Sequence, residues 1–338
     1  MKIVADIDIP LIQSYFGKGC DLILKPGRAL THADILTADA LIVRTVTPVN
    51  QALLDNTAVK WVGSVATGTD HLDTAWLEKA GIHWSAAKGC NTTAVVHYVL
   101  GVIAGLQVRG YLKEKPRAAV IGVGRIGRKV AHLLNTIGFD TVLCDPIRAT
   151  HEKNFVSVAL DDIEECDFIT LHTPLEKTGD YPTYHFIEKR FLSRQKKGCI
   201  VLNTSRGSVI DFKDLKHYGQ HLLWCLDVWE SEPDIDQEIL QRALLATPHI
   251  AGYSQHAKER AIEMMYEAAV LQKIIPPIKE TLPMPPLPLV QIDAKGAWRE
   301  ELLRLYNPFL TSEQLKASPT SFDALRKTLS TRKECLIK

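Results

Sequence analysis

One short segment limits the folds open to this chain more than any other. Between Arg117 and Asp145, an apolar run leads into Gly122-x-Gly124-x-x-Gly127, an amphipathic stretch, a second apolar run and a terminal acid. This order predicts a strand, a tight turn, a helix and a second strand, the unit that binds dinucleotides. Gly122 would permit the turn, Gly124 would let backbone amides approach a pyrophosphate, and Gly127 would let the helix pack against the sheet. A glycine turn that serves only helix packing is the alternative.

The acid at the end of the second predicted strand bears on which dinucleotide binds. The Asp145 carboxylate can accept hydrogen bonds from both hydroxyls of the adenosine ribose and would repel a 2′-phosphate. Arg148 could favour a 2′-phosphate, but it follows Pro146 and is not adjacent to the acid. We therefore expect NAD rather than NADP. Arg125 and Ile126 begin the helix whose N-terminus would face the pyrophosphate.

Composition excludes several classes of protein. The 338 residues are 46% hydrophobic, enough for two substantial cores, and the 40 basic residues nearly balance the 39 acidic ones. This balance gives no electrostatic reason to expect nucleic acid or a membrane as partner, and no apolar run approaches the roughly 20 residues of a membrane span. Seven scattered cysteines without a Cys-x-x-Cys pair suggest neither a disulfide framework nor a zinc site. We expect a cytoplasmic protein without a metal.

Short strand-like runs alternate with helix-compatible segments on both sides of a long helix expected from Asn91 to about Arg109. Such alternation implies parallel sheets with both faces covered, so the expected fold class is α/β with two doubly wound parallel-sheet domains. The expected strands are 2–6, 21–24, 40–44, 61–65 and 82–86, then 117–121, 141–144, 168–171, 200–203, 222–226 and 246–247. Further helices are expected at 255–273, 298–306 and 321–333, with a proline-rich linker or arm over 274–290.

The carboxyl ends of the second domain's strands carry unusual residues. Ligands of doubly wound sheets bind outside these ends, so we expect the residues to meet in one crevice. They are Gly122, Asp145, His172, Thr173, Pro174, Thr204, Ser205, Arg206, Asp227 and His249.

Three residues of the second domain suggest acid–base chemistry on a substrate that carries a carboxylate. The Arg206 guanidinium can hold a carboxylate bidentately, although it could instead pair with Asp211 or a cofactor phosphate. His249 can take and return a proton near neutral pH, and Glu232 could orient its ring, although any one histidine is more often structural. Asp227 could contact a nicotinamide.

Residues of the first domain and of the loop after His249 complete the candidate set. Arg44 and Thr45 end one expected strand, and Ala66, Thr67 and Gly68 follow another. The amides around Gly68 could cradle an anion of the substrate, or the loop could simply cap the next helix. Gly252 and Tyr253 lie just beyond His249, where we expect them beside the cofactor and the substrate respectively.

Five ordered motifs give the chain a family resemblance: the glycine turn, Asp145, NTSRG, DVWESEP and TPHIAGY. Over roughly residues 1–272 the chain resembles the D-2-hydroxyacid dehydrogenases. The resemblance implies that Arg206 binds the carboxylate and carbonyl of the substrate, that Glu232 supports His249, and that His249 is the proton donor or acceptor.

The runs LIVRTVTPVN, GTDHLD, AAKGCNTTAVVHYVL, LCDPIRA and HTPL are similar to one branch of this family. That branch implies NAD-dependent oxidation of 4-phospho-D-erythronate to 3-hydroxy-2-oxo-4-phosphooxybutanoate by a homodimer. It also implies a flavodoxin-like substrate domain at 1–90 plus 265–285, a Rossmann NAD domain at 91–264 and a shortened dimerisation region at 286–338. The apolar residues of the 91–109 helix offer a further dimer contact.

Two other functions are compatible with the same residues. Another D-2-hydroxyacid dehydrogenase, such as one acting on phosphoglycerate, would share the same motifs. A non-catalytic NAD-sensing protein could be built on the same fold, but the intact set of Arg206, Glu232 and His249 argues against it.

Overall fold

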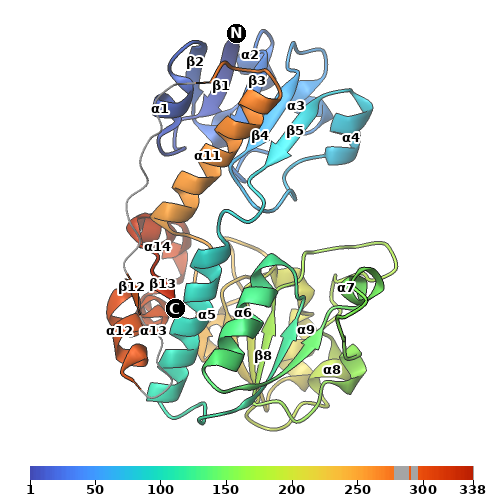
Figure 1. Ribbon diagram of the computed structural model, residues 1–338, viewed down its shortest axis with the longest axis vertical. Coiled ribbons are helices and arrows are strands. Elements are labelled where there is room, and N and C mark those ends of the chain that lie inside the picture. Colours follow the sequence, from blue (N-terminus) through green and yellow to red (C-terminus); the bar gives the residue numbers. More distant parts are fainter. Residues whose placement is uncertain (278–288, 291–295, 338) are drawn as a thin grey trace. The chain divides into compact units, whose positions relative to one another are not determined.

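The chain folds into two compact units in a computed structural model that describes residues 1–277, 289–290 and 296–337 (Figure 1). Met1–Asn91 and Gln255–Pro286 form the first unit, and Thr92–Ser254 and Leu287–Lys338 form the second. Within the described ranges, no helix has both the length and the apolar character required to cross a membrane.

The first unit is built on a five-stranded parallel sheet of order β2-β1-β3-β4-β5. This is the flavodoxin-like order expected of a doubly wound sheet. The strands are β1 (Lys2–Asp6), β2 (Asp21–Lys25), β3 (Ala40–Val43), β4 (Trp61–Ser64) and β5 (His83–Ala86). The helices are α1 (Ile12–Phe16), α2 (His32–Ile35), α3 (Gln51–Leu54), α4 (Thr74–Lys79) and α11 (Gln255–Leu271).

Both faces of the first sheet are covered, as its fully buried central strands β3 and β4 require. Ile3 and Ala5 of β1 point into a core shared with α1 and α11, whereas Val4 points into the core on the opposite face. The central strand β3 is buried at all four positions. Helix α11 returns the chain to this unit and packs against β4 and β5, so residues far apart in sequence share one core.

The second unit has a six-stranded parallel sheet of order β11-β10-β9-β8-β6-β7. Beyond β7, the amide of Val158 donates to the Leu143 carbonyl at 2.9 Å. This backbone hydrogen bond lies at the sheet edge where the Rossmann order 3-2-1-4-5-6 has a further strand. The strands are β6 (Arg117–Ile121), β7 (Asp140–Cys144), β8 (Phe168–Leu171), β9 (Ile200–Asn203), β10 (Leu223–Leu226) and β11 (Leu245–Ala246). The expected α/β fold class is confirmed.

Helices cover both faces of this second sheet. They are α5 (Thr92–Val108), α6 (Arg125–Thr136), α7 (Pro146–His151), α8 (Lys189–Leu192), α9 (Phe212–Tyr218) and α10 (Gln237–Arg242). The carboxyl-terminal part of the chain adds α12 (Trp298–Leu305), α13 (Pro308–Ala317) and α14 (Phe322–Thr328).

Helix α5 is buried over nearly its whole length, because neighbours surround it. Helix α6 packs on one side, and α12 and α13 of the same chain pack on another (Figure 1). Its side chains belong to one core with Trp298 and Phe309. The apolar residues of α5, which we considered as a dimer contact, are therefore used within the unit.

The carboxyl-terminal region differs from expectation in its details. Helix α13 was missed, although Asn307 caps it and Pro308 occupies its first turn, a recognisable start signal. The helix expected over 321–333 ends earlier, at Thr328, and continues as the 3-10 turn Leu329–Thr331. Most of the proline-rich run 274–290 lies outside the described residues, apart from 274–277 and β12 (Leu289–Val290), which pairs with β13 (Leu336–Ile337).

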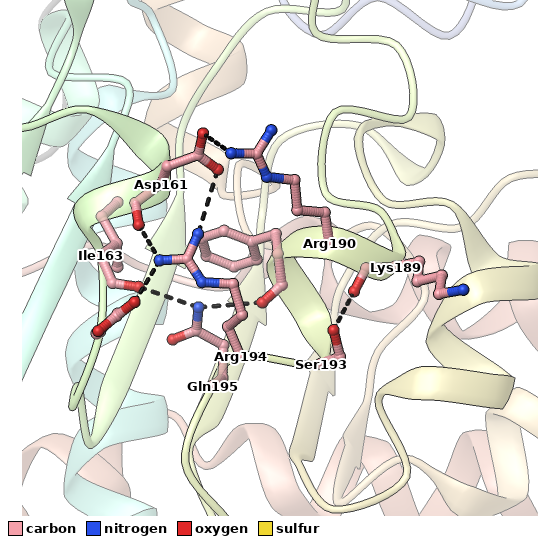
Figure 2. Close-up of polar contacts among 9 residues, drawn as sticks. Asp161, Ile163, Lys189, Arg190, Ser193, Arg194 and Gln195 are labelled. Atoms are coloured by element: carbon pink, nitrogen blue, oxygen red, sulfur yellow. Dashed lines mark hydrogen bonds and ion pairs between the residues drawn. The ribbon is translucent and has the colours of Figure 1, made fainter.

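A surface network fixes α8 to the segment that precedes β8 (Figure 2). Arg190 Nη2 lies 2.7 Å from Asp161 Oδ2, and Arg194 contacts both Asp161 and Glu164. Gln195 Nε2 donates to the Ile163 carbonyl at 3.1 Å. Exposed pairs of this kind contribute little to stability, so these arginines suit control substitutions.

Candidate active site

The glycine turn after β6 requires glycine on steric grounds at two positions and leaves open space at a third. Gly122 has φ of +83°, and a Cβ there would lie 2.8 Å from the carbonyl carbon of His172. A Cβ on Gly127 would lie 2.0 Å from the Gly122 carbonyl oxygen, so helix α6 can approach the turn only with glycine here. A Cβ on Gly124 would meet nothing within 4 Å. The open space at Gly124, at the N-terminus of α6, is where a pyrophosphate could approach the backbone.

Asp145 stands at the end of β7, where it touches the glycine turn. Its Oδ2 accepts a hydrogen bond from the Val123 amide at 2.8 Å, and its Oδ1 caps α7 by accepting from the Arg148 amide at 2.9 Å. Each oxygen keeps a second lone pair, so ribose hydroxyls can still be accepted. The carboxylate is thus held in a fixed orientation beside the turn.

The Arg148 side chain is engaged by residues next to its own helix α7. Its Nη2 lies 2.6 Å from Glu152 Oε2, its Nη1 donates to the Val123 carbonyl at 3.2 Å, and its guanidinium stacks on Phe155 at 4.1 Å. The hydrogen bond from Arg148 lowers the pKa of Glu152, so the pair stays ionised at neutral pH. Arg148, the basic residue that we weighed in favour of NADP, is therefore paired with a neighbouring carboxylate.

His172, Thr173 and Pro174 follow β8 and line the other side of the glycine turn. The His172 ring contacts Thr170 Oγ1 at 3.0 Å and Thr204 Oγ1 at 3.2 Å. Burial lowers the pKa of His172 to about 3, so the ring is neutral at physiological pH. Thr173 Oγ1 is buried and has no hydrogen-bond partner among the described residues. An orphaned hydroxyl beside an open glycine cradle fits a bound dinucleotide.

Arg206 follows β9 on a turn that is fixed from two sides. The Asn203 side chain donates to the Arg206 carbonyl at 2.8 Å and accepts from the Ser205 amide and hydroxyl. Gly207 follows Arg206, and its backbone lies outside the left-handed region, so the turn itself does not require glycine here. Its true constraint is packing, because a Cβ would lie 2.0 Å from the Trp229 carbonyl carbon. The glycine lets the Arg206 turn lie directly against the loop that carries Glu232.

Glu232 and His249 form a pair in the same unit. Glu232 Oε2 lies 2.7 Å from His249 Nδ1, and Glu232 Oε1 accepts from the Trp229 amide at 3.0 Å. Burial acts to raise the pKa of Glu232, but the charge and hydrogen bond of His249 and the Trp229 amide outweigh it and hold the pKa below its usual value. The His249 backbone has φ of +52°, an unusual conformation for a residue with a side chain.

Asp227 holds the loop that presents His249. The Asp227 carboxylate is fully buried and accepts from Thr247 Oγ1 at 2.6 Å and from the amides of Ile250 and Ala251 at 2.8 Å each. The Asp227 carbonyl also accepts from the His249 amide at 2.7 Å. These four bonds account for the strained backbone at His249, which the surrounding loop fixes in place.

The strand order places the residues that carry these side chains on neighbouring strands. Arg206, Asp227 and His249 follow β9, β10 and β11, which are successive neighbours in the sheet, and backbone bonds link Asn203 to Asp227 and Asp227 to His249. Gly252 and Tyr253 continue the same loop, and the Tyr253 amide donates to the Ile250 carbonyl.

Arg44 belongs to the first unit and is already paired there. Its Nε lies 2.7 Å from Asp6 Oδ2, and its Nη2 lies 2.6 Å from Asp8 Oδ2. Asp6 is buried at the end of β1, beside the end of β3 that carries Arg44. Thr45 is exposed next to this cluster. Sequence reasoning missed both aspartates, although an acid at the end of β1 was a visible signal.

The loop Ala66, Thr67 and Gly68 follows β4 and is only partly buried. The Thr67 hydroxyl donates to Asn91 Oδ1 at 2.9 Å and approaches the Ala87 carbonyl at 3.3 Å. This hydroxyl therefore fixes the loop to the end of the first unit, close to where the chain enters α5.

Comparison with known proteins agrees with this arrangement. Residues 104–251 match the family described as "D-isomer specific 2-hydroxyacid dehydrogenase, NAD binding domain". The chain belongs to the D-2-hydroxyacid dehydrogenases, and the expectation of NAD as cofactor is confirmed.

Its curated relatives are more specific. A protein of Coxiella burnetii named erythronate-4-phosphate dehydrogenase is 41% identical over 99% of this chain and 93% of its own length. A protein of the same name from Pseudomonas savastanoi is 37% identical over 99% of this chain and 93% of its own. Among solved structures, NAD-bound 3-phosphoglycerate dehydrogenase of Entamoeba histolytica has a TM-score of 0.68 at 20% identity and covers 80% of this chain and 95% of its own, a likeness of fold.

Proposed function

We propose that this chain oxidises 4-phospho-D-erythronate to (R)-3-hydroxy-2-oxo-4-phosphooxybutanoate with NAD, a step of pyridoxal 5′-phosphate biosynthesis. The observation that carries the chemistry is the 2.7 Å contact between Glu232 Oε2 and His249 Nδ1, beside the turn that bears Arg206. The substrate is supported by the relatives named erythronate-4-phosphate dehydrogenase, at 36–41% identity.

His249 is the proton acceptor in this proposal, and Glu232 selects the nitrogen that acts. Glu232 is ionised because its pKa is lowered, so it can only accept a hydrogen bond. Nδ1 of the neutral ring must then carry the hydrogen, which leaves the lone pair on Nε2. Nε2 removes the proton of the C2 hydroxyl, and the carboxylate stabilises the imidazolium that forms.

Arg206 orients the substrate for this transfer. Its guanidinium can hold the substrate carboxylate through two parallel hydrogen bonds, which fixes the C2–H bond as well as the acid group. Bound NAD supplies the acceptor for the hydride that leaves C2. The hydroxyl proton passes to His249 and then to solvent, so one hydroxy acid and NAD give one keto acid, NADH and a proton.

The residues that would hold NAD lie along the strand ends of the second unit. The amides at Gly124, Arg125 and Ile126 would receive the pyrophosphate, and Asp145 would receive the adenosine ribose. The loops with His172 to Pro174, with Thr204 and Ser205, and with Asp227 and Gly252 would border the rest of the cofactor. We assign Thr45, Ala66, Thr67, Gly68 and Tyr253 to the substrate, and Arg44, the sixth candidate, would have to reach it while paired with Asp6 and Asp8.

The decisive experiment compares substrates. NADH formation should be fast with 4-phosphoerythronate and at least tenfold weaker in kcat/KM with 3-phosphoglycerate or D-lactate. Arg190→Gln, in the surface network of Figure 2, is the matched arginine control and should leave all three rates unchanged. A preference for 3-phosphoglycerate would replace the substrate assignment, and NAD binding without turnover of any hydroxy acid would favour an NAD sensor.

We also propose that the first unit serves as the substrate domain and the second as the NAD domain of a cytoplasmic homodimer. The resemblance supports the dimer, and because α5 is covered by α12 and α13, the exposed Leu305 and Leu310 of the carboxyl-terminal region are better contact candidates. Light scattering at micromolar concentration should give the dimer mass, and Leu310→Lys should shift it toward the monomer. A monomeric wild type would reject the assembly.

A further inference from the structure

The carboxyl-terminal part of the chain is anchored to the loop that follows His249. Arg332 is 8% exposed, and its Nη2 donates to the Ala251 carbonyl at 2.7 Å while its Nε donates to the Tyr253 carbonyl at 3.1 Å. Two residues later, Glu334 is 1% exposed and accepts from Ser254 Oγ at 2.5 Å. Charged groups buried in this way must keep their partners, so the anchor fixes both segments relative to each other.

This anchor places a second arginine of the same region beside the candidate site. Arg326 lies on α14, and its guanidinium carbon is 5.5 Å from the centre of the Tyr253 ring. Its charge also acts on Glu232, as one of the weaker influences that lower the pKa of that carboxyl against the raising effect of burial. Both observations put the Arg326 guanidinium close to the proton-transfer pair of the second unit.

Arg326 has unused capacity to bind an anion. Its side chain is 26% exposed, and its ion pair with Asp323 spans 4.0 Å, the outer limit of such a contact. Its Nε is buried and has no hydrogen-bond partner within the described part of the chain. A partly exposed guanidinium with an unpaired donor, resting on an aromatic ring, is well suited to a phosphate.

The other two arginines that we consider for the substrate already have partners or another role. Arg44 of the first unit is held by Asp6 and Asp8, and Arg206 is assigned to the substrate carboxylate. A phosphorylated hydroxy acid carries a second anionic group, a dianion near neutral pH, which needs its own cation.

We propose that Arg326, supplied by the carboxyl-terminal region, binds the phosphate of the substrate. The proposal rests on the proposed function, because it assumes a phosphorylated 2-hydroxy acid. It also assigns a role in substrate selection to a region that the resemblance associates with dimerisation alone. The anchor formed by Arg332 and Glu334 holds α14 where Arg326 can reach the substrate.

The test compares a phosphorylated substrate with its unphosphorylated analogue. Arg326→Gln should lower kcat/KM for 4-phosphoerythronate roughly tenfold to a hundredfold, mainly through KM, as expected for loss of a charged hydrogen-bonding partner. The slow reaction with D-erythronate should be unchanged, so the preference for the phosphorylated acid collapses. Inorganic phosphate should inhibit the wild type competitively and Arg326→Gln much more weakly.

Two further variants make the result specific. Arg326→Lys keeps the charge and should recover part of the preference, which a purely structural defect would not allow. Lys327→Gln removes an exposed cation from the same helix and should behave as the wild type. Calorimetric titration of 4-phosphoerythronate into the NADH complex supplies a readout independent of turnover.

The outcomes separate this proposal from the proposed function. Equal losses with both substrates, or no loss with either, would overturn the role of Arg326 while leaving the dehydrogenase intact. If the wild type instead prefers 3-phosphoglycerate, the role of Arg326 is decided by the ratio of kcat/KM with 3-phosphoglycerate to kcat/KM with glycerate. Arg326→Gln should then lower that ratio. If no phosphorylated acid is preferred by the wild type, both the substrate and Arg326 assignments fail.

Discussion

Glu232 Oε2 lies 2.7 Å from His249 Nδ1, and this single contact assigns the two nitrogens of the ring different tasks. The nitrogen facing the carboxylate carries hydrogen, and the other is left as the base. The backbone of His249 is held in a strained conformation by Asp227, so the ring has a defined direction as well as a defined tautomer.

Replacing His249 by asparagine should separate chemistry from binding. His249→Asn should lower kcat by roughly a hundredfold or more, because a positioned general base is lost, while the affinity for NAD stays within twofold. Steady-state kinetics and calorimetry with NAD measure the two quantities. His217→Asn, on the exposed surface of α9, is the control. Wild-type turnover by His249→Asn would remove this residue from the mechanism.

The glycine turn offers a matched pair of alanine substitutions with opposite outcomes. Gly127→Ala should destabilise the protein by about 1–3 kcal/mol or more, because its Cβ would lie 2.0 Å from the Gly122 carbonyl. Gly124→Ala should change stability by less than about 0.5 kcal/mol, since its Cβ meets no protein atom within 4 Å. It should nevertheless weaken NAD binding at least tenfold. Thermal unfolding of the cofactor-free protein measures the stability, and titration with NAD measures the affinity. Unchanged NAD affinity in Gly124→Ala would contradict the pyrophosphate site at this glycine.

Asp145 should determine the preference for NAD over NADP. Asp145→Ala should lower the ratio of NAD affinity to NADP affinity at least tenfold, because the carboxylate that accepts from the ribose and repels a 2′-phosphate is gone. The same change removes the cap of α7, so stability should also fall by about 1 kcal/mol. Calorimetry with both cofactors on one variant isolates the preference from the stability loss. A ratio that stays at the wild-type value would show that Asp145 does not read the ribose.

His172 should make the folded protein sensitive to mild acid. Its pKa of about 3 lies below the value of about 6.5 in an unfolded chain, so its contribution to stability is complete above pH 6.5 and is lost as pH falls toward 3. The loss is at most about 1.4 kcal/mol per pH unit in that window. His172→Gln should therefore lose less stability between pH 7 and pH 5 than the wild type does.

The measurement is urea unfolding at several pH values, with His151→Gln as the control on an exposed histidine. An NMR pH titration of the histidine ring signals gives a direct check, in which the His172 ring should remain neutral down to about pH 4. Protonation of that ring near pH 6.5 would contradict the burial that we describe.

Local sequence chemistry determined much of this protein. The strand, turn, helix and acid around Gly122, Gly124, Gly127 and Asp145 are contiguous, and the constraint on Gly127 comes from Gly122, only five residues before it. The ends of parallel strands meet at one edge of a sheet, so strand positions alone were enough to bring the residues after β9, β10 and β11 together. These features depend on spacing along the chain, which a sequence displays directly.

Only the tertiary structure decided which partners those residues have. Arg44 meets Asp6 across 38 positions, and Arg332 meets the Ala251 carbonyl across 81, so both contacts join residues that are distant in the sequence. Gly207 illustrates the same limit, because its role comes from the backbone of Trp229 rather than from its own turn. Contacts of this kind follow from how buried surfaces pack, and packing depends on the whole unit at once.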